Sequence, residues 1–125
     1  MIKLSIPISR NVLFTFDELL AKVVDDVLKS IFSERFAFSV WTYLEMMFSI
    51  EPLDIARKPD AFSVGLKNLF AAAAPDLERL ILKRLCQVLA VNLELKEGYN
   101  FSDYISELRK AYSEIEVARY KHFIQ

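Results

Sequence analysis

The chain has few residues that interrupt regular structure: two glycines and four prolines among 125 residues. Sandwiches and barrels need many turns, which these residues usually form, so their shortage favours long helices over an all-β fold. The chain also lacks an excess of either charge, with 16 Lys and Arg against 17 Asp and Glu. Proteins that bind nucleic acid usually carry a basic excess on one face, so we expect no nucleic acid and no membrane as a partner.

Cysteine and histidine occur once each, as Cys86 and His122. One thiol forms no internal disulfide, and one residue of each kind supplies too few ligands for a usual zinc site. Cys86 lies among leucines, where burial would raise its pKa and leave the thiol unreactive, and His122 is expected on the surface. We therefore expect no metal or other cofactor, and a reducing, cytoplasmic location.

Long apolar runs and catalytic motifs are also missing. No stretch of about 18 apolar residues is free of charge, so no membrane-spanning helix is expected, and the start of the chain does not have the pattern of a signal peptide. There is no glycine-rich phosphate loop, no nucleophile elbow and no HExxH pair. Asp25 and Asp26 are adjacent and would point about 100° apart on a helix, which does not suit paired acid–base chemistry. The sequence therefore predicts that the chain is not an enzyme.

What the chain does have is apolar side chains, which make up 54% of its residues and suffice for the core of one domain, 1–125. Apolar residues recur at the spacing of a helix in five segments. These predicted helices span residues 15–32, 33–49, 59–70, 75–89 and 100–118. The sequence thus predicts an all-α fold of five helices in bundle-like, orthogonal packing.

Local signals mark where these helices begin. Thr15 with Glu18 has the pattern of a capping box, and Ser33 and Asn100 are N-cap residues of the second and fifth helices. Prolines open the third and fourth helices, at a position where the missing amide hydrogen costs nothing. Each predicted start therefore has a residue type suited to it.

The hydrophobic spacing also predicts which side chains face the core. The fourth helix is apolar over about half its circumference, and Val88 lies within that arc. Met47 lies on the broad apolar face of the second helix. Gly65 lies inside the third helix, where glycine costs up to about 1 kcal/mol relative to alanine, so a close contact is expected there.

The first 14 residues form a predicted N-terminal arm. Ile2, Leu4, Ile6 and Ile8 alternate with polar residues or proline, which is typical of a half-buried strand. Pro7 limits such a strand to the edge of a sheet. The arm is therefore expected to lie over the helices, to pair with residues 93–96, or to pair with a second copy of the chain.

A second group of apolar residues lies outside the main helical stripes. Phe38 and Met46 project beside the polar side of the second helix, and the tail 119–125 is expected to extend beyond the core. Such residues favour a self-associating module, a homodimer, or one that binds another protein. The candidate interface consists of Ile2, Leu4, Ile6, Phe38, Met46, Arg119, Tyr120 and Phe123.

Two alternatives remain open. In the first, aromatic residues line a pocket for a small ligand, and the chain is a sensor; the candidates are Trp41, Tyr43, Phe48, Phe62 and Phe70. In the second, the third and fourth helices form a DNA-binding helix-turn-helix. The second alternative is the weaker, because the fourth helix begins Pro-Asp-Leu-Glu, which is acidic where phosphates would lie.

Several motifs between residues 30 and 111 point to a family. Leu44-Glu45 precedes an acidic connector, a helix starts with Pro59 to Phe62, Leu66 to Phe70 ends it, and Leu77-Glu78 opens the next helix. These segments resemble a small helical archaeal family, the fifth class of Nitrosopumilus output domains, although that family has glycines at two corners where this chain has Phe-Ser and Ala-Ala. The resemblance implies an archaeal, cytoplasmic, regulatory or signalling output domain, with no catalytic residue to carry over.

Overall fold

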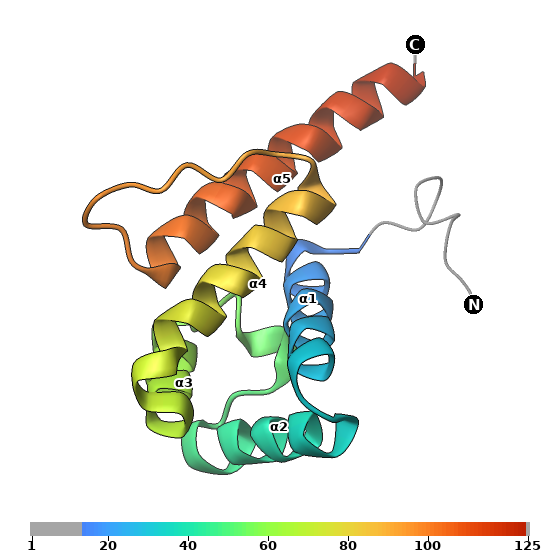
Figure 1. Cartoon of the computed structure of the whole chain (residues 1–125). Coiled ribbons are helices and arrows are strands. Elements are labelled where there is room, and N and C mark those ends of the chain that lie inside the picture. Colours follow the sequence, from blue (N-terminus) through green and yellow to red (C-terminus); the bar gives the residue numbers. More distant parts are fainter. Residues whose placement is uncertain (1–13, 125) are drawn as a thin grey trace.

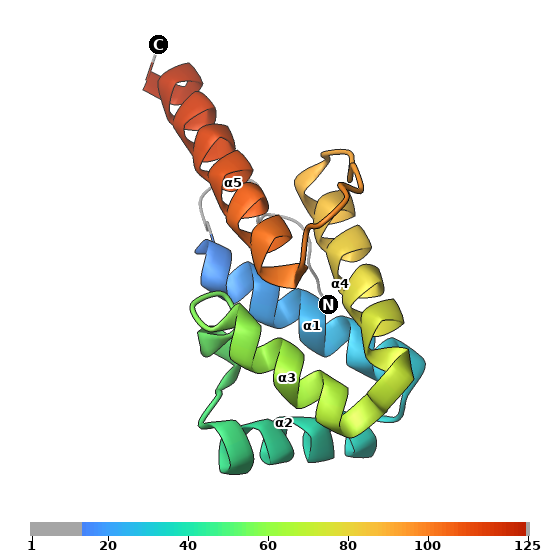
Figure 2. The same cartoon turned by 90° about the vertical axis from the view of Figure 1, so that its left-hand side faces the viewer.

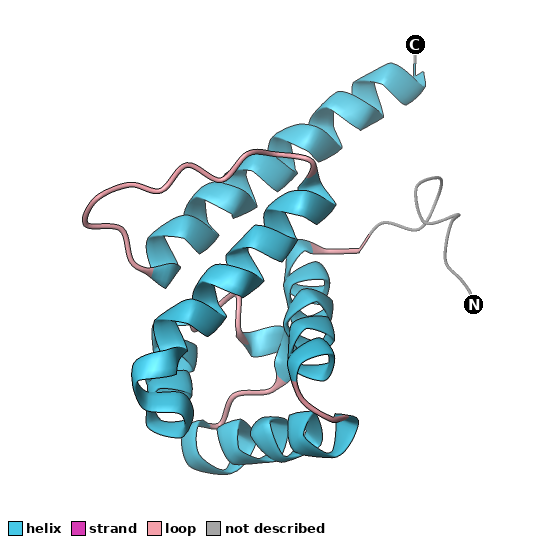
Figure 3. Cartoon of the chain, viewed as in Figure 1, coloured by secondary structure: helices cyan, strands magenta, loops and turns pink. Residues whose placement is uncertain are grey.

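The computed structural model describes the backbone of residues 14–124 and the side chains of residues 14–116. This part of the chain contains five α-helices and two short 3-10 helices and no strand (Figure 3). The elements are α1 (Phe16–Ile31), α2 (Glu34–Phe48), η2 (Pro52–Asp54), α3 (Pro59–Phe70), η3 (Ala71–Ala73), α4 (Ala74–Leu89) and α5 (Phe101–Ile124). The predicted all-α fold is confirmed.

The predicted helix caps are present. The Thr15 hydroxyl accepts a hydrogen bond from the amide of Glu18 at 3.1 Å, and the Glu18 carboxylate accepts one from the amide of Thr15 at 2.9 Å. The Ser33 hydroxyl accepts from the amide of Phe36 at 3.0 Å. Asn100 and Asp103 form the same reciprocal pair of bonds at the start of α5. Each cap satisfies amides that have no partner inside the helix, which is typically worth about 1 kcal/mol.

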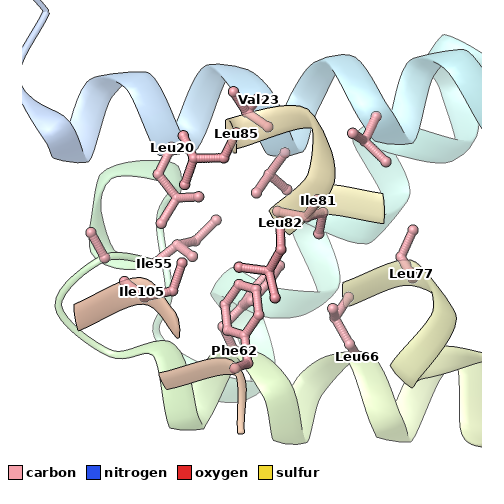
Figure 4. Packing of buried hydrophobic residues seen from close by; sticks show 14 of the residues in the cluster. Leu20, Val23, Ile55, Phe62, Leu66, Leu77, Ile81, Leu82, Leu85 and Ile105 are labelled. Atoms are coloured by element: carbon pink, nitrogen blue, oxygen red, sulfur yellow. The ribbon is translucent and has the colours of Figure 1, made fainter. Parts of the chain in front are cut away.

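The core lies around α4, which packs against α1, α3 and α5 (Figures 1 and 2). Figure 4 shows its side chains meeting those of the three surrounding helices and of the connector between α2 and α3. The labelled residues are Leu20, Val23, Ile55, Phe62, Leu66, Leu77, Ile81, Leu82, Leu85 and Ile105. All ten are buried, and a fully buried side chain of this kind contributes about 1.5–3 kcal/mol.

Two elements lie at the margins of this core. Helix α2 crosses one end of the molecule, and the last turns of α5 extend away from the other helices (Figures 1 and 2). The predicted tail 119–125 begins inside α5, whose backbone is helical to Ile124. The predicted arm, apart from Phe14, lies outside the described residues. Within the described residues, Phe38 and Met46 on the outside of α2 are not covered by another helix.

Candidate functional site

The outer face of α2, which we define by Phe38, Thr42 and Met46, carries the most exposed apolar side chains of this helix. Phe38 is 71% exposed and Met46 is 75% exposed, which confirms that both lie outside the core stripe. The opposite side of α2 is buried against α1 and α3 through Ala37, Val40 and Leu44. Because its members are four residues apart, the outer face forms a stripe about 12 Å long.

The hydroxyl groups on this side of α2 bond to the helix itself. The Thr42 hydroxyl donates to the carbonyl of Phe38 at 2.9 Å, and the Ser39 hydroxyl donates to the carbonyl of Arg35 at 3.2 Å. Both donors are therefore satisfied within α2, without water or a residue of another element. The Thr42 hydroxyl therefore leaves no unsatisfied donor between Phe38 and Met46 on the outer face of α2.

Met47 extends the apolar surface beyond the predicted stripe. Its expected place in the core was wrong, since the side chain is 62% exposed. The buried side of α2 is centred on Leu44, and Met47 lies at the border of that side, where neither α1 nor α3 covers it. The remaining candidate interface residues lie outside the described part: Ile2, Leu4 and Ile6 in the arm, and the side chains of Arg119, Tyr120 and Phe123.

The five aromatic residues of the ligand-pocket alternative take part in separate packing contacts. The rings of Phe62 and Phe101 lie 5.7 Å apart in the core, and those of Tyr43 and Phe48 lie 6.1 Å apart. Phe70 stacks on a phenylalanine of the α1–α2 corner, with ring centroids 5.5 Å apart. The Trp41 indole donates a hydrogen bond to the carboxylate of Asp25 in α1. None of the five lines the groove described below, so no observation in the described structure favours this alternative.

The two adjacent aspartates of α1 have different partners. Asp25 accepts a hydrogen bond from Trp41 Nε1 at 2.9 Å and pairs with Lys29 at 2.8 Å. Asp26 pairs instead with Lys22 at 3.3 Å. Burial raises the pKa of Asp25, but the hydrogen bonds from Lys29 and Trp41 outweigh it, so its pKa lies below the ordinary value. Asp25 therefore connects α1 to α2 and does not act together with Asp26.

Cys86 is buried in α4, as predicted. Its exposed fraction is 3%, and burial raises the pKa of the thiol, which keeps it protonated and unreactive at neutral pH. The described residues contain no group of three His, Cys, Asp or Glu side chains placed to hold a metal ion. None of the helices in that part of the chain combines the length and the apolar character needed to span a bilayer.

A groove of about 1060 Å³ lies between α3, the start of α4 and the loop 90–100; we call it the loop groove. Three of its lining side chains are apolar and face water: Val64 is 50% exposed, Leu95 is 67% exposed and Tyr99 is 36% exposed. This groove could not be predicted from the sequence, because its walls come from segments about 40 residues apart that only the packing of α3 on α5 brings together.

A polar cluster of Lys96, Tyr99, Tyr104 and Glu107 holds the loop against α5. The Tyr104 hydroxyl accepts from the amide of Lys96 at 2.8 Å and donates to its carbonyl at 3.3 Å. Glu107 Oε2 accepts from Lys96 Nζ at 2.9 Å and from the Tyr99 hydroxyl at 2.6 Å. The sequence shows only that Tyr104 and Glu107 are three residues apart, and thus neighbours on one side of α5.

These contacts shift three pKa values. The hydrogen bonds from Tyr99 and Lys96 lower the pKa of Glu107. The hydrogen bond to Glu107 raises the pKa of Lys96 and that of Tyr99. Each shift favours the form that makes the hydrogen bond, namely the carboxylate, the ammonium and the neutral phenol. The cluster therefore fixes one wall of the loop groove over a wide range of pH.

No protein-family model matches the chain, and neither a curated protein nor a solved structure matches it. The resemblance to archaeal output domains therefore stays a prediction.

Proposed function

We propose that this chain is a non-enzymatic helical interaction module, a cytoplasmic archaeal domain of the regulatory output type, that forms a homodimer through the outer face of α2. The observation that carries the proposal is the exposure of Phe38 and Met46, 71% and 75%, on a helix whose other side is buried. Two long apolar side chains in one line cost free energy in water, about 25 cal/mol for each Å² that a partner would cover.

The arrangement of these residues suits a second copy of the chain. A two-fold interface brings one surface patch against the same patch of the partner. Phe38 and Met46 each lie four residues from Thr42, on opposite sides of it. If two α2 helices pack antiparallel about Thr42, each Phe38 ring meets a Met46 thioether, a contact worth about 0.3–1.5 kcal/mol. The outer face of α2 is in this sense complementary to itself.

The size of this surface predicts a weak dimer. Helix α2 has 15 residues and is about 22 Å long, so it covers less than the roughly 1,200 Å² of a standard interface. A dissociation constant in the micromolar range is expected. Such a dimer dissociates readily, which suits a regulatory module whose state changes with its concentration.

Sedimentation velocity and light scattering over a range of micromolar concentrations test the proposal. We expect the wild-type mass to rise toward that of a dimer, and Phe38→Asp to remain a monomer with unchanged helix content. Val88→Asp is the matched control, since Val88 is 50% exposed on α4, away from α2, and should leave the dimer intact. A wild-type chain that stays monomeric at all these concentrations overturns the proposal, as does equal dissociation by both variants.

A further inference from the structure

The loop beside the groove has backbone amides without a partner among the described residues. The amides of Asn92, Leu93, Glu94 and Leu95 make no hydrogen bond within the described residues. Both ends of this stretch are nevertheless held: the amide of Val91 bonds to the carbonyl of a residue in α4, and the polar cluster of Lys96, Tyr99, Tyr104 and Glu107 holds the other end. A fixed stretch with free amides is a template to which an extended segment adds by backbone pairing.

The side chains around this stretch add an apolar receiving surface. Leu93 packs against the core, whereas Leu95 lines the loop groove together with Val64 and Tyr99. The groove of about 1060 Å³ has room for several aliphatic side chains. An occupant would therefore need an extended backbone and apolar residues at alternating positions, since alternate side chains of a strand point to one face.

The N-terminal arm of this chain has that pattern. Ile2, Leu4, Ile6 and Ile8 occupy every second position of the first eight residues. The only charged side chains among residues 1–13 are those of Lys3 and Arg10, so the arm is basic.

The charges of the receiving surface are complementary to the arm. Glu94 and Glu97 in the loop form no ion pair within the described residues, and neither do Asp60 and Glu78 in the wall of the groove. These four carboxylates outnumber the one cation of the groove wall, Lys67, that forms no ion pair with another described residue. A basic, alternating segment therefore fits the groove better than an acidic one.

The arm of the same chain can reach the groove. The carbonyl of Phe14, where the described chain begins, accepts a hydrogen bond from the Tyr112 hydroxyl of α5. Tyr104 lines the groove eight residues earlier on α5, which is about 12 Å along the helix. Thirteen extended residues span up to about 43 Å. Since a tethered segment has an effective concentration in the millimolar range, the arm of the same copy outcompetes that of a second copy.

We propose that the loop groove is the binding site of the N-terminal arm of the same chain, which pairs through its backbone with residues 92–95 and inserts alternating aliphatic side chains beside Leu95. This inference is independent of the proposed dimer, because no residue that lines the groove belongs to α2. The arm then acts as an intramolecular strand that covers an apolar surface.

Disulfide trapping in the full chain tests this pairing. Leu4→Cys, Ile6→Cys and Ile8→Cys are each combined with Leu95→Cys, and the products of mild oxidation are separated on a non-reducing gel and mapped by mass spectrometry. The matched control combines the same arm variants with Val88→Cys, which is similarly exposed but does not line the groove.

We expect at least one pair with Leu95→Cys to give a cross-linked monomer in at least fivefold higher yield than the control pairs. Equal yields in both sets overturn the inference. A cross-linked dimer as the main product also overturns it, because the arm would then occupy the groove of a second copy. Adding Phe38→Asp should leave the yield of cross-linked monomer unchanged, which separates this result from that of the dimer.

Amide hydrogen exchange gives a second measurement that needs no new cysteine. We expect the alternate amides of residues 92–95 that face the arm to exchange at least tenfold faster in Ile6→Asn than in the wild-type chain. The matched control is Ser5→Asn, which adds the same polar group on the other side of an alternating segment, keeps the charge of the arm, and should leave the rates within twofold of wild type. Unchanged rates in Ile6→Asn, or equal acceleration in both variants, contradict the inference.

Discussion

Ala71 has a backbone conformation that residues other than glycine rarely adopt, with φ 52° and ψ −122°. Strain of this kind costs about 1–3 kcal/mol, whereas the extra freedom that glycine gives the unfolded chain costs about 1 kcal/mol or less. We therefore expect Ala71→Gly to stabilise the protein by about 1 kcal/mol, measured by urea unfolding. Ala73→Gly is the matched control, because Ala73 is exposed in the same corner but has φ −83°; it should destabilise by about 0.5–1 kcal/mol. A loss of stability in Ala71→Gly contradicts the prediction.

Gly65 presents the opposite case, a position where a side chain has no room. A Cβ atom there would lie 2.5 Å from Cδ2 of Leu44, which is fully buried. Overpacking costs about 1–3 kcal/mol, and the better helix propensity of alanine returns at most about 1 kcal/mol. We expect Gly65→Ala to lower the free energy of unfolding by about 1 kcal/mol. The short distance to Leu44 confirms the close contact expected at this glycine.

A double-mutant cycle shows whether Leu44 is the cause of this loss. In a Leu44→Ala background the clash is removed, so Gly65→Ala should become neutral or stabilising. Asn68→Ala, an exposed change on the same helix, is expected to have the same small effect in both backgrounds. Equal losses for Gly65→Ala with and without Leu44 would mean that the cost does not come from this contact.

At the scale of elements, the loop 90–100 depends on its anchor to α5. Tyr104→Phe removes both hydrogen bonds to the backbone of Lys96 while keeping the buried ring. We expect the amide of Lys96 to exchange with solvent at least tenfold faster in this variant, with little change at amides in the middle of α3. Unaltered exchange at Lys96 would show that the hydroxyl does not hold the loop.

The same anchor should respond to pH in a defined direction. The pKa of Glu107 is lowered by its hydrogen bonds in the folded state. Its contribution to the stability of the anchored loop is therefore complete above the ordinary glutamate pKa of about 4.3, and it is lost as pH falls through the folded-state pKa. The pKa values of Lys96 and Tyr99 are raised. Their contributions to the stability of the anchored loop are therefore complete below about pH 10, and they are lost as pH rises through the folded-state pKa values. Loop order is therefore expected to be constant between these limits.

The amide chemical shift of Tyr99 is a measure of this order, since its N–H donates to the carbonyl of Lys96. In Glu107→Gln the transition on the acid side should disappear from the titration of this shift. The exposed change Glu114→Gln, on the same helix, should keep it. An acid transition that persists in Glu107→Gln would assign it to another group.

The start of each helix could be predicted from the sequence because its signals are local, whereas the end of α5 was predicted at residue 118 and lies at Ile124. A cap or a proline acts within one turn, and the prediction for α3, Pro59–Phe70, agrees with the structure. The burial of single side chains was less predictable. Val88 lies in the apolar arc of α4 yet is 50% exposed, because hydrophobic spacing gives the direction of a side chain and not the extent of its neighbours. The loop groove depends on contacts between segments that are distant in the sequence, and no local pattern predicts such contacts.

At the scale of the whole molecule, the proposed dimer predicts which residues face each other. In an antiparallel pair of α2 helices, position 38 of one copy faces position 46 of the other. In a parallel pair, each position faces its own equivalent. Phe38→Asp and Met46→Lys should each weaken the dimer at least tenfold. Each change places a charge against an apolar side chain of the other copy, so the charge would be buried without a counter-charge.

The double variant distinguishes the two arrangements. If the helices are antiparallel, the new carboxylate at position 38 faces the new ammonium at position 46 of the partner, twice in each dimer. Combining Phe38→Asp with Met46→Lys should then restore at least part of the association, and the restored dimer should weaken as salt is added. In a parallel dimer like charges would face each other, so the double variant would associate less than either single one.

The pair Phe38→Asp with Met46→Asp is the control, since it gives like charges in both arrangements and should remain monomeric. Restored association in the first double variant and not in the second, measured by sedimentation equilibrium, would place the two-fold axis at Thr42.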